Sequence, residues 1–166
     1  MTDRNSQLQQ IIEQNPGIQF REIMRSSGLK NGVVSHYLGK LEKSGVINVN
    51  RGPRQSRFYS LHITKEEAIV IKALRKQTPR DLLLALIMQD GLEFSQLVQE
   101  VKKSPSTVSL YLSQLVEDGL VKTSVVSLKK KYHIKAIELV DKLIEDYRPT
   151  VLEKATSGYE DIFNSL

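Results

Sequence analysis

Hydrogen-bonding side chains recur at helical spacing along the segment from Asn31 to Ser44. Val34, Leu38 and Leu41 have the spacing of a buried helix face, which leaves the polar residues on the opposite side. Asparagine can pair with adenine through two hydrogen bonds, and serine and histidine can reach base edges or phosphates. The pattern therefore predicts a helix that contacts double-stranded nucleic acid, although the same residues would suit a solvated face. The candidate contact residues are Lys30, Asn31, Gly32, Ser35, His36 and Lys40.

Three arginines follow this helix, where the sequence becomes strand-like. Residues 46–49 and 57–61 are rich in β-formers and flank a polar stretch that contains Gly52-Pro53, which predicts a hairpin. Arginine at a hairpin tip can neutralise phosphates or enter a narrow minor groove. A charged loop is often merely solvated, but its place beside a polar helix favours a nucleic-acid contact. The candidates in the hairpin are Arg51, Arg54 and Arg57.

The chain contains this unit twice. A constant offset of 74 positions superimposes residues 17–45 on residues 91–119 without a gap. In the second copy Leu110 replaces His36, and the helix over residues 104–116 has no lysine or arginine. We expect this copy to make weaker contacts with the phosphate backbone or to face a protein partner, and to have a much shorter wing loop. Its candidate contact residues are Ser106, Thr107, Ser109, Lys129 and Lys130.

The elements around these residues define the expected fold. Each copy is predicted to form three short helices and then a hairpin, the order of a winged helix-turn-helix domain. These domains should span residues 1–62 and 78–134, joined by a helix over residues 63–77 that begins with a capping box at Thr64. Residues 135–166 are predicted to form a C-terminal helical segment that joins two subunits. The predicted fold class is α+β, mostly α, with two tandem winged helices.

Charge and composition narrow the class of function. Residues 1–62 hold nine Lys/Arg and four Asp/Glu, whereas residues 63–166 hold fifteen of each, so the net charge of +5 lies in the first copy. This favours a polyanionic partner there. Cysteine is absent, and His36, His62 and His133 are widely spaced. We therefore expect no metal, no cofactor and no catalysis. Since no apolar run approaches the length of a membrane span, a cytoplasmic protein is expected.

An apolar stripe runs through the last 30 or so residues. Its members are spaced by threes and fours, which predicts one or two amphipathic helices with a kink at Arg148-Pro149. The stripe could join two subunits into a homodimer, which we favour, or pack back on its own domain. The candidate dimerisation residues are Ile137, Val140, Ile144, Tyr147, Val151, Tyr159 and Ile162.

The segment from Gly28 to Ile47 resembles the turn and recognition helix of the ArsR/MarR-like winged-helix transcriptional regulators. The duplication, with a helix between the copies and a helix after them, is similar to the tandem winged-helix regulators of archaea. The resemblance implies promoter or operator binding by a dimer, a place on the nucleoid and possible contact with the transcription machinery. It also implies recognition positions at Ser35 and His36. The alternative is a tandem winged-helix scaffold for protein–protein contacts in a chromosome-associated or transcription assembly.

Overall fold

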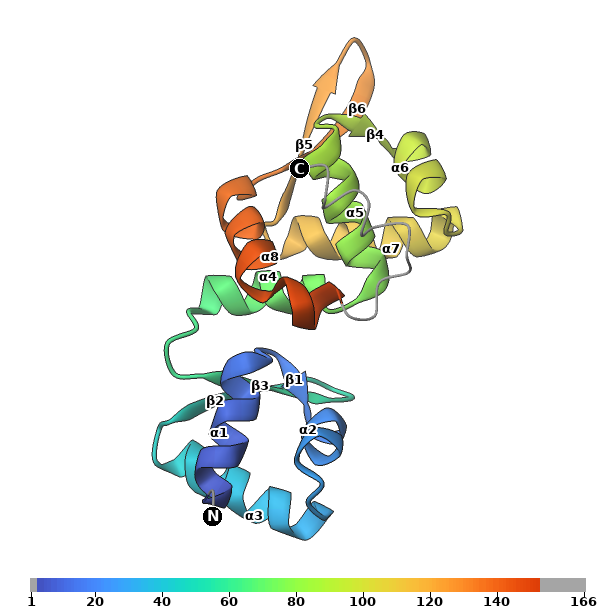
Figure 1. The fold of residues 1–166 in the computed structure, drawn as a ribbon. Helices are drawn as coiled ribbons and strands as arrows, with labels where there is room; N and C mark the ends of the chain where they lie inside the picture. The colour runs from blue at the N-terminus through green and yellow to red at the C-terminus, as the bar shows by residue number, and fades with distance from the viewer. Residues whose placement is uncertain (1–2, 153–166) are drawn as a thin grey trace. The chain divides into compact units, whose positions relative to one another are not determined.

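The computed structural model describes residues 3–152, and the side chains of residues 3–147. The chain forms two compact units, Met1–Ala68 and Ile69–Leu166 (Figure 1). The described residues form helices and two small antiparallel sheets, so the predicted fold class is confirmed. None of the described helices is long and apolar enough to cross a membrane.

The first unit is a three-helix cluster closed by a three-stranded sheet. Its buried side chains come from all three helices and from the sheet. The strands lie in the order β1-β3-β2, which makes β3 the central strand. The elements are α1 (Arg4–Gln14), β1 (Ile18–Gln19), α2 (Phe20–Ser27), α3 (Asn31–Lys43), β2 (Ile47–Arg51) and β3 (Ser56–Ser60), and α4 (Lys65–Leu74) begins at its end.

Local sequence determines where these helices begin and end. Gln19 and Glu22 form a capping box at the start of α2, and Gly28 ends that helix in the left-handed conformation, with φ of 71°. A residue with a Cβ is strained at this angle, which explains the glycine at the turn before α3. The predicted capping box before α4 is also present, since the backbone amide of Glu67 donates to Thr64 Oγ1 at 3.1 Å.

The second unit repeats this plan around a helix that is buried on nearly all sides. That helix, α5, buries eight of its twelve residues, including Arg80 and Asp81. The second sheet has the order β4-β6-β5, equivalent to the first. The elements are α5 (Gln77–Met88), β4 (Leu92–Glu93), α6 (Phe94–Val101), α7 (Pro105–Glu117), β5 (Val121–Val126), β6 (Lys129–Ile134) and α8 (Ile137–Leu152).

The two wings contain the same number of residues, but the second has the shorter loop, as predicted: residues 52–55 separate β2 from β3, whereas residues 127–128 separate β5 from β6. Ile47 pairs with Ser60, and Val121 pairs with Ile134, so the offset of 74 persists through the hairpin. In the first wing the amide of Gly52 donates to the carbonyl of Gln55 at 2.9 Å, which closes a two-residue turn. Gly52-Pro53 ends the strand pattern earlier in the first wing, which gives it the longer loop.

The described part of the C-terminal stripe is partly buried inside its own unit. Val140 and Ile144 are 0% and 4% exposed, so the prediction that they contact another subunit is wrong for these two residues. Ile137 is half exposed. Tyr147 is half-buried, and its φ of −119° marks a kink directly before Arg148-Pro149. The side chain of Val151 lies outside the described side chains, and Tyr159 and Ile162 lie outside the described residues.

Candidate nucleic-acid interface

Helix α3 presents a narrow stripe of small and polar residues. Gly32, Ser35, His36 and Gly39 follow the spacing i, i+3, i+4, i+7, which places them on one face of the helix. The first three are exposed, and Gly39 is half-buried. The buried residues Val34, Leu38 and Leu41 lie on the opposite face and anchor α3 to the first unit. The stripe therefore points away from the core.

The two glycines of this stripe have no role in packing the unit. A Cβ built on Gly32 or on Gly39 would meet no atom of the described residues within 4 Å beyond the helix itself and the neighbouring residues. Glycine inside a helix costs about 1 kcal/mol relative to alanine. The fold itself thus gives no reason for glycine at either position. Glycine at both positions would be explained by a partner whose surface must approach the helix backbone closely.

The N-terminal half of α3 carries the predicted hydrogen-bonding groups. Ser35 Oγ donates to Asn31 Oδ1 at 3.4 Å, so these two side chains lie together on the first turns. Lys30 precedes the helix, and no side chain in the described part of the chain caps its first amides. Such amides attract anions, and phosphate in particular. Lys30, Asn31 and Ser35 are all exposed.

Two cationic side chains contact the ring of Tyr37, beside the stripe. The ammonium of Lys40 lies 5.5 Å from the centre of its ring, and the guanidinium of Arg4 lies 5.9 Å from it. The His36 ring meets Tyr37 edge-on at 5.2 Å. Arg4 comes from α1 and was not among the sequence candidates, because its closeness to α3 depends on the tertiary fold. Lys43, which continues the stripe by one turn, was also overlooked.

Arg51 is tied to the recognition helix. Its two terminal nitrogens each donate to Glu42 at 2.7 Å, in a bidentate ion pair that joins β2 to α3. These hydrogen bonds lower the pKa of Glu42 from its ordinary value of 4.5 and raise the pKa of Arg51. The pair is therefore intact at neutral pH and is lost as the pH falls through the lowered pKa of Glu42. Each terminal nitrogen of Arg51 keeps a second N–H for a phosphate, although the neighbouring Glu42 carboxylate offsets the charge of the guanidinium.

Arg57 does not lie on the surface, which corrects its place among the contact candidates. Its side chain is buried on β3, where the residue is 5% exposed, and the guanidinium donates to the carbonyl of Gly17 at 2.8 Å. Burial lowers its pKa, although arginine keeps its charge at any physiological pH. Arg57 therefore holds β3 to the turn before β1. Arg54, by contrast, lies exposed at the wing tip.

Alanine at Arg57 and at Arg54 should thus have different effects. Arg57→Ala removes the donor to a buried carbonyl and should lower the free energy of unfolding by about 3 kcal/mol. Arg54→Ala should change it by less than about 0.5 kcal/mol, because the side chain is exposed. Urea denaturation of the two variants measures both values. Equal stability of the two variants would contradict a structural role for Arg57.

The recognition helix of the second unit keeps the serine equivalent to Ser35, at Ser109, but differs from α3 at the other positions of the stripe. At the offset of 74, its stripe reads Ser106, Ser109, Leu110 and Ser113, and Glu117 replaces Lys43. Its N-terminus is capped from within, since the hydroxyl of Ser104 accepts from the amide of Thr107 at 3.3 Å. The same hydroxyl lies 2.9 Å from Thr107 Oγ1 and 3.2 Å from Ser106 Oγ. The start of α7 is therefore less open to a phosphate than the start of α3.

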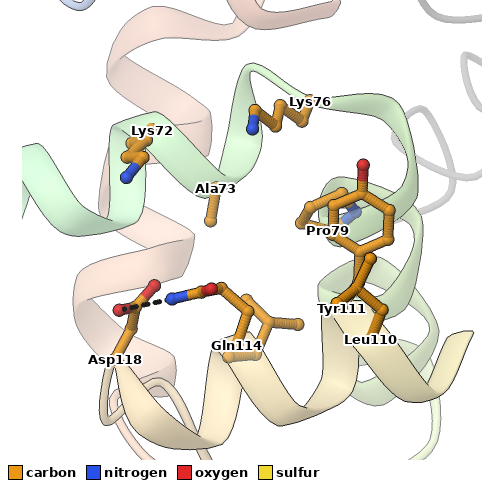
Figure 2. Close-up of a pocket in the computed structure, with 9 residues that line it drawn as sticks. Lys72, Ala73, Lys76, Pro79, Leu110, Tyr111, Gln114 and Asp118 are labelled. Carbon is orange, nitrogen blue, oxygen red and sulfur yellow. Dashed lines mark hydrogen bonds between the residues drawn. The ribbon is translucent and has the colours of Figure 1, made fainter. Parts of the chain in front are cut away.

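One side of α7 forms the wall of a pocket, shown in Figure 2. Leu110, Tyr111 and Gln114 of α7 face Lys72 and Lys76 across a space of about 270 Å³. Leu110 is nevertheless 66% exposed. The remaining lining residues are Ala73, Pro79, Leu115 and Asp118.

A network of side chains braces the second wing. His133 on β6 contacts Ser124 Oγ of β5 through Nε2 at 2.7 Å and Asp90 through Nδ1 at 3.0 Å. These contacts join the two strands of the wing to the turn before β4. The candidate lysines, Lys129 and Lys130, lie at the start of β6, near the tip of the wing. Lys129 is 3.7 Å from Glu93, and the ammonium of Lys130 lies 5.5 Å from the centre of the Tyr132 ring.

Comparison with known families gives one match in each half of the chain. Residues 8–48 match the winged helix-turn-helix DNA-binding family, and residues 72–123 match the arsR family of bacterial regulatory proteins. The repeated fold and these two matches support the two winged helix-turn-helix domains that the resemblance predicted, one in each unit. The two matched families are described as DNA-binding and regulatory. The archaeal origin stays a prediction.

Two solved structures are similar to part of the chain. HlyU from Vibrio cholerae N16961 is 23% identical with a TM-score of 0.44, and the match covers 50% of this chain and 89% of that one. A MarR-family transcriptional regulator from Silicibacter pomeroyi is 22% identical with a TM-score of 0.41, over 61% of this chain and 76% of that one. A comparison with the sequences of curated proteins gives no match.

Proposed function

We propose that this protein regulates transcription by binding specific sequences in double-stranded DNA through its first unit. In this proposal α3 lies in the major groove with the Gly32–Gly39 stripe toward the base edges. Asn31, Ser35 and His36 read bases, while Lys30, Lys40 and Arg54 contact phosphates. Arg4, Lys43 and Arg51 extend this phosphate-binding surface.

The observation that carries the proposal is the pair of glycines on α3. They weaken the helix, and the fold gives no reason for them. In the major groove, helix backbone and base edges approach each other closely, so short side chains are required at the point of contact. The glycines flank Ser35 and His36, the hydrogen-bonding members of the stripe. A merely solvated face would have no need of glycine.

The charge distribution supports the same assignment. All of the net positive charge is carried by residues 1–62. The open amides at the start of α3 and the cations around Tyr37 would meet the phosphates on either side of a groove. Helix α7 has a capped start and an acidic last turn, so its predicted contacts through Ser106, Thr107 and Ser109 take a minor part.

The proposal extends to assembly and location. A homodimer would place two α3 helices on half-sites about 34 Å apart, or one turn of the duplex. Since Val140 and Ile144 are buried within one subunit, the dimer contact would involve other residues, with Ile137 and the end of the chain as candidates. We place the protein in the cytoplasm, on the nucleoid, where its DNA lies.

Selection of bound duplexes from a random pool tests the function. The full chain should enrich a defined motif, and a palindrome would indicate a dimer. Ser35→Ala should relax the preference at one or two positions by about 1–3 kcal/mol. Arg54→Ala should weaken binding to all sequences and reduce the slope of log K against log salt by about 1. A chain that binds no duplex at low salt would refute the proposal and leave the protein-scaffold role.

A further inference from the structure

The second wing ends in an apolar tip. Leu128 is 99% exposed, and Val125 and Val126 are 71% and 52% exposed. The hairpin of β5 and β6 projects beyond the helices of its unit (Figure 1), and the three residues lie next to its turn at residues 127–128. Position 54 of the first wing, equivalent to Leu128, holds an arginine. Contiguous apolar side chains on a projecting element are typical of a contact surface.

The backbone of this tip is strained. Ser127 and Leu128 have φ of 52° and 67°, the left-handed conformation that a two-residue turn of this kind requires. Glycine and asparagine are the usual residues there, and a residue with a branched side chain costs about 1 kcal/mol. Because the Leu128 side chain is exposed, its burial within the unit does not offset this cost. Strain combined with exposure indicates that Leu128 serves a partner.

Cations lie on both faces of the ribbon. Val126 is paired with Lys129, and Val125 is paired with Lys130. Directly opposite residues share a face, and successive residues alternate, so each face of the tip carries one valine and one lysine. The surface that fits this arrangement has negative charge on two sides and apolar or weakly polar groups between them.

We propose that the second wing enters the minor groove of DNA, with Leu128 as an apolar wedge, while Lys129 turns from Glu93 and Lys130 from the Tyr132 ring to one phosphate strand each. A groove has two phosphate walls, which matches a ribbon with a cation on each face. Apolar side chains that enter the minor groove separate a base step and bend the duplex by about 20–90°. The inference rests on the proposed function for its partner and adds to it a bend produced by the second unit.

The charge pattern and the family matches favour DNA over other partners. An anionic lipid surface would also accept apolar tips with nearby lysines. Both halves of this chain, however, match families of DNA-binding regulators. The requirement for α3 and the requirement for Leu128 are separable, because they lie in different units.

Bending of a selected duplex tests the wedge. Full-length protein is added to a duplex that it enriches from a random pool, labelled at both ends, and the end-to-end distance is followed by energy transfer. Wild-type protein should shorten this distance. Leu128→Gly should leave the duplex straight and weaken binding by about tenfold, the effect of losing one buried apolar side chain. Because glycine relieves the positive φ, this variant should be at least as stable as wild type.

Leu128→Met, which keeps an apolar side chain, is the matched control and should still bend DNA. Binding without bending by the wild type, or equal bending by Leu128→Gly, would overturn the wedge and leave the proposed function intact. A wild-type chain that binds no duplex would overturn both. Flotation with phosphatidylserine-containing vesicles that is lost in Leu128→Gly, while DNA binding is unchanged, would assign the tip to a membrane surface instead.

Discussion

Replacing Gly39 with leucine should make the protein more stable and abolish its recognition of specific DNA. Leucine has a higher helix propensity than glycine by about 0.8 kcal/mol, and a Cβ at this position meets no atom of the described residues within 4 Å beyond its local backbone. On the outward stripe, however, the new side chain would hold α3 away from the base edges. Binding should then fall to the non-specific level, weaker by about a thousandfold or more.

Opposite changes in stability and affinity are the diagnostic result. Thermal unfolding gives the stability, and a mobility-shift titration on the selected duplex gives the affinity. The repeat supplies a matched control in Ser113→Leu, which makes the equivalent change on α7 and should leave affinity nearly unchanged. Gly39→Ala should fall between wild type and Gly39→Leu. Full affinity in Gly39→Leu would show that this face of α3 stays in solvent.

The repeat made the fold of each unit predictable from the sequence. Apolar spacing identified the core residues of α3 and α7, and glycines at equivalent positions located the helix ends. The structure extends the offset of 74 through the hairpin register, which was not predicted because Gly52-Pro53 interrupts the strand pattern of the first wing. The polar stripe of α3 could be predicted, since the buried face of a helix determines the exposed one.

The burial of Arg57 could not be predicted, because it depends on a strand of two residues. β1 is too short to leave a pattern in the sequence, yet it pairs with β3 through Ile18 and Gln19. With partners on both sides, β3 is a central strand, and Arg57, Phe58, Tyr59 and Ser60 are all buried. If β1 is not recognised, β3 has the pattern of an exposed wing strand, and Arg57 is then predicted to contact a phosphate.

The contact between Arg4 and Tyr37 illustrates a second limit. The residues are 33 positions apart, and no sequence motif links them. Their closeness follows from the packing of α1 against α3. Periodicity tells which face of each helix is buried, but the angle at which two helices cross depends on side-chain packing along both. A cation that reaches α3 from another helix, as Arg4 does, can therefore be identified from the structure but not from the sequence.

The C-terminal stripe shows that an apolar pattern does not specify its partner. The hydrophobic effect depends on the area removed from water and has no direction, so a helix stripe can be buried in the same subunit or in another. The second unit buries Val140, Leu143 and Ile144 itself. The spacing of the residues correctly predicted a helix and a kink, but not the surface that covers it.

Ile144→Ala should therefore destabilise the second unit by about 3 kcal/mol, the usual cost of removing a buried isoleucine side chain. Ile137→Ala is a matched control on the same helix, where the residue is 50% exposed, and should cost much less. Denaturation at several protein concentrations distinguishes packing from dimerisation. If Ile144 stabilises one subunit, the loss of stability in Ile144→Ala is the same at every protein concentration. If Ile144 lies between two subunits, the unfolding midpoint rises with protein concentration, and the loss of stability in the variant depends on that concentration. A concentration-dependent loss for both variants would restore the dimer contact to this part of α8.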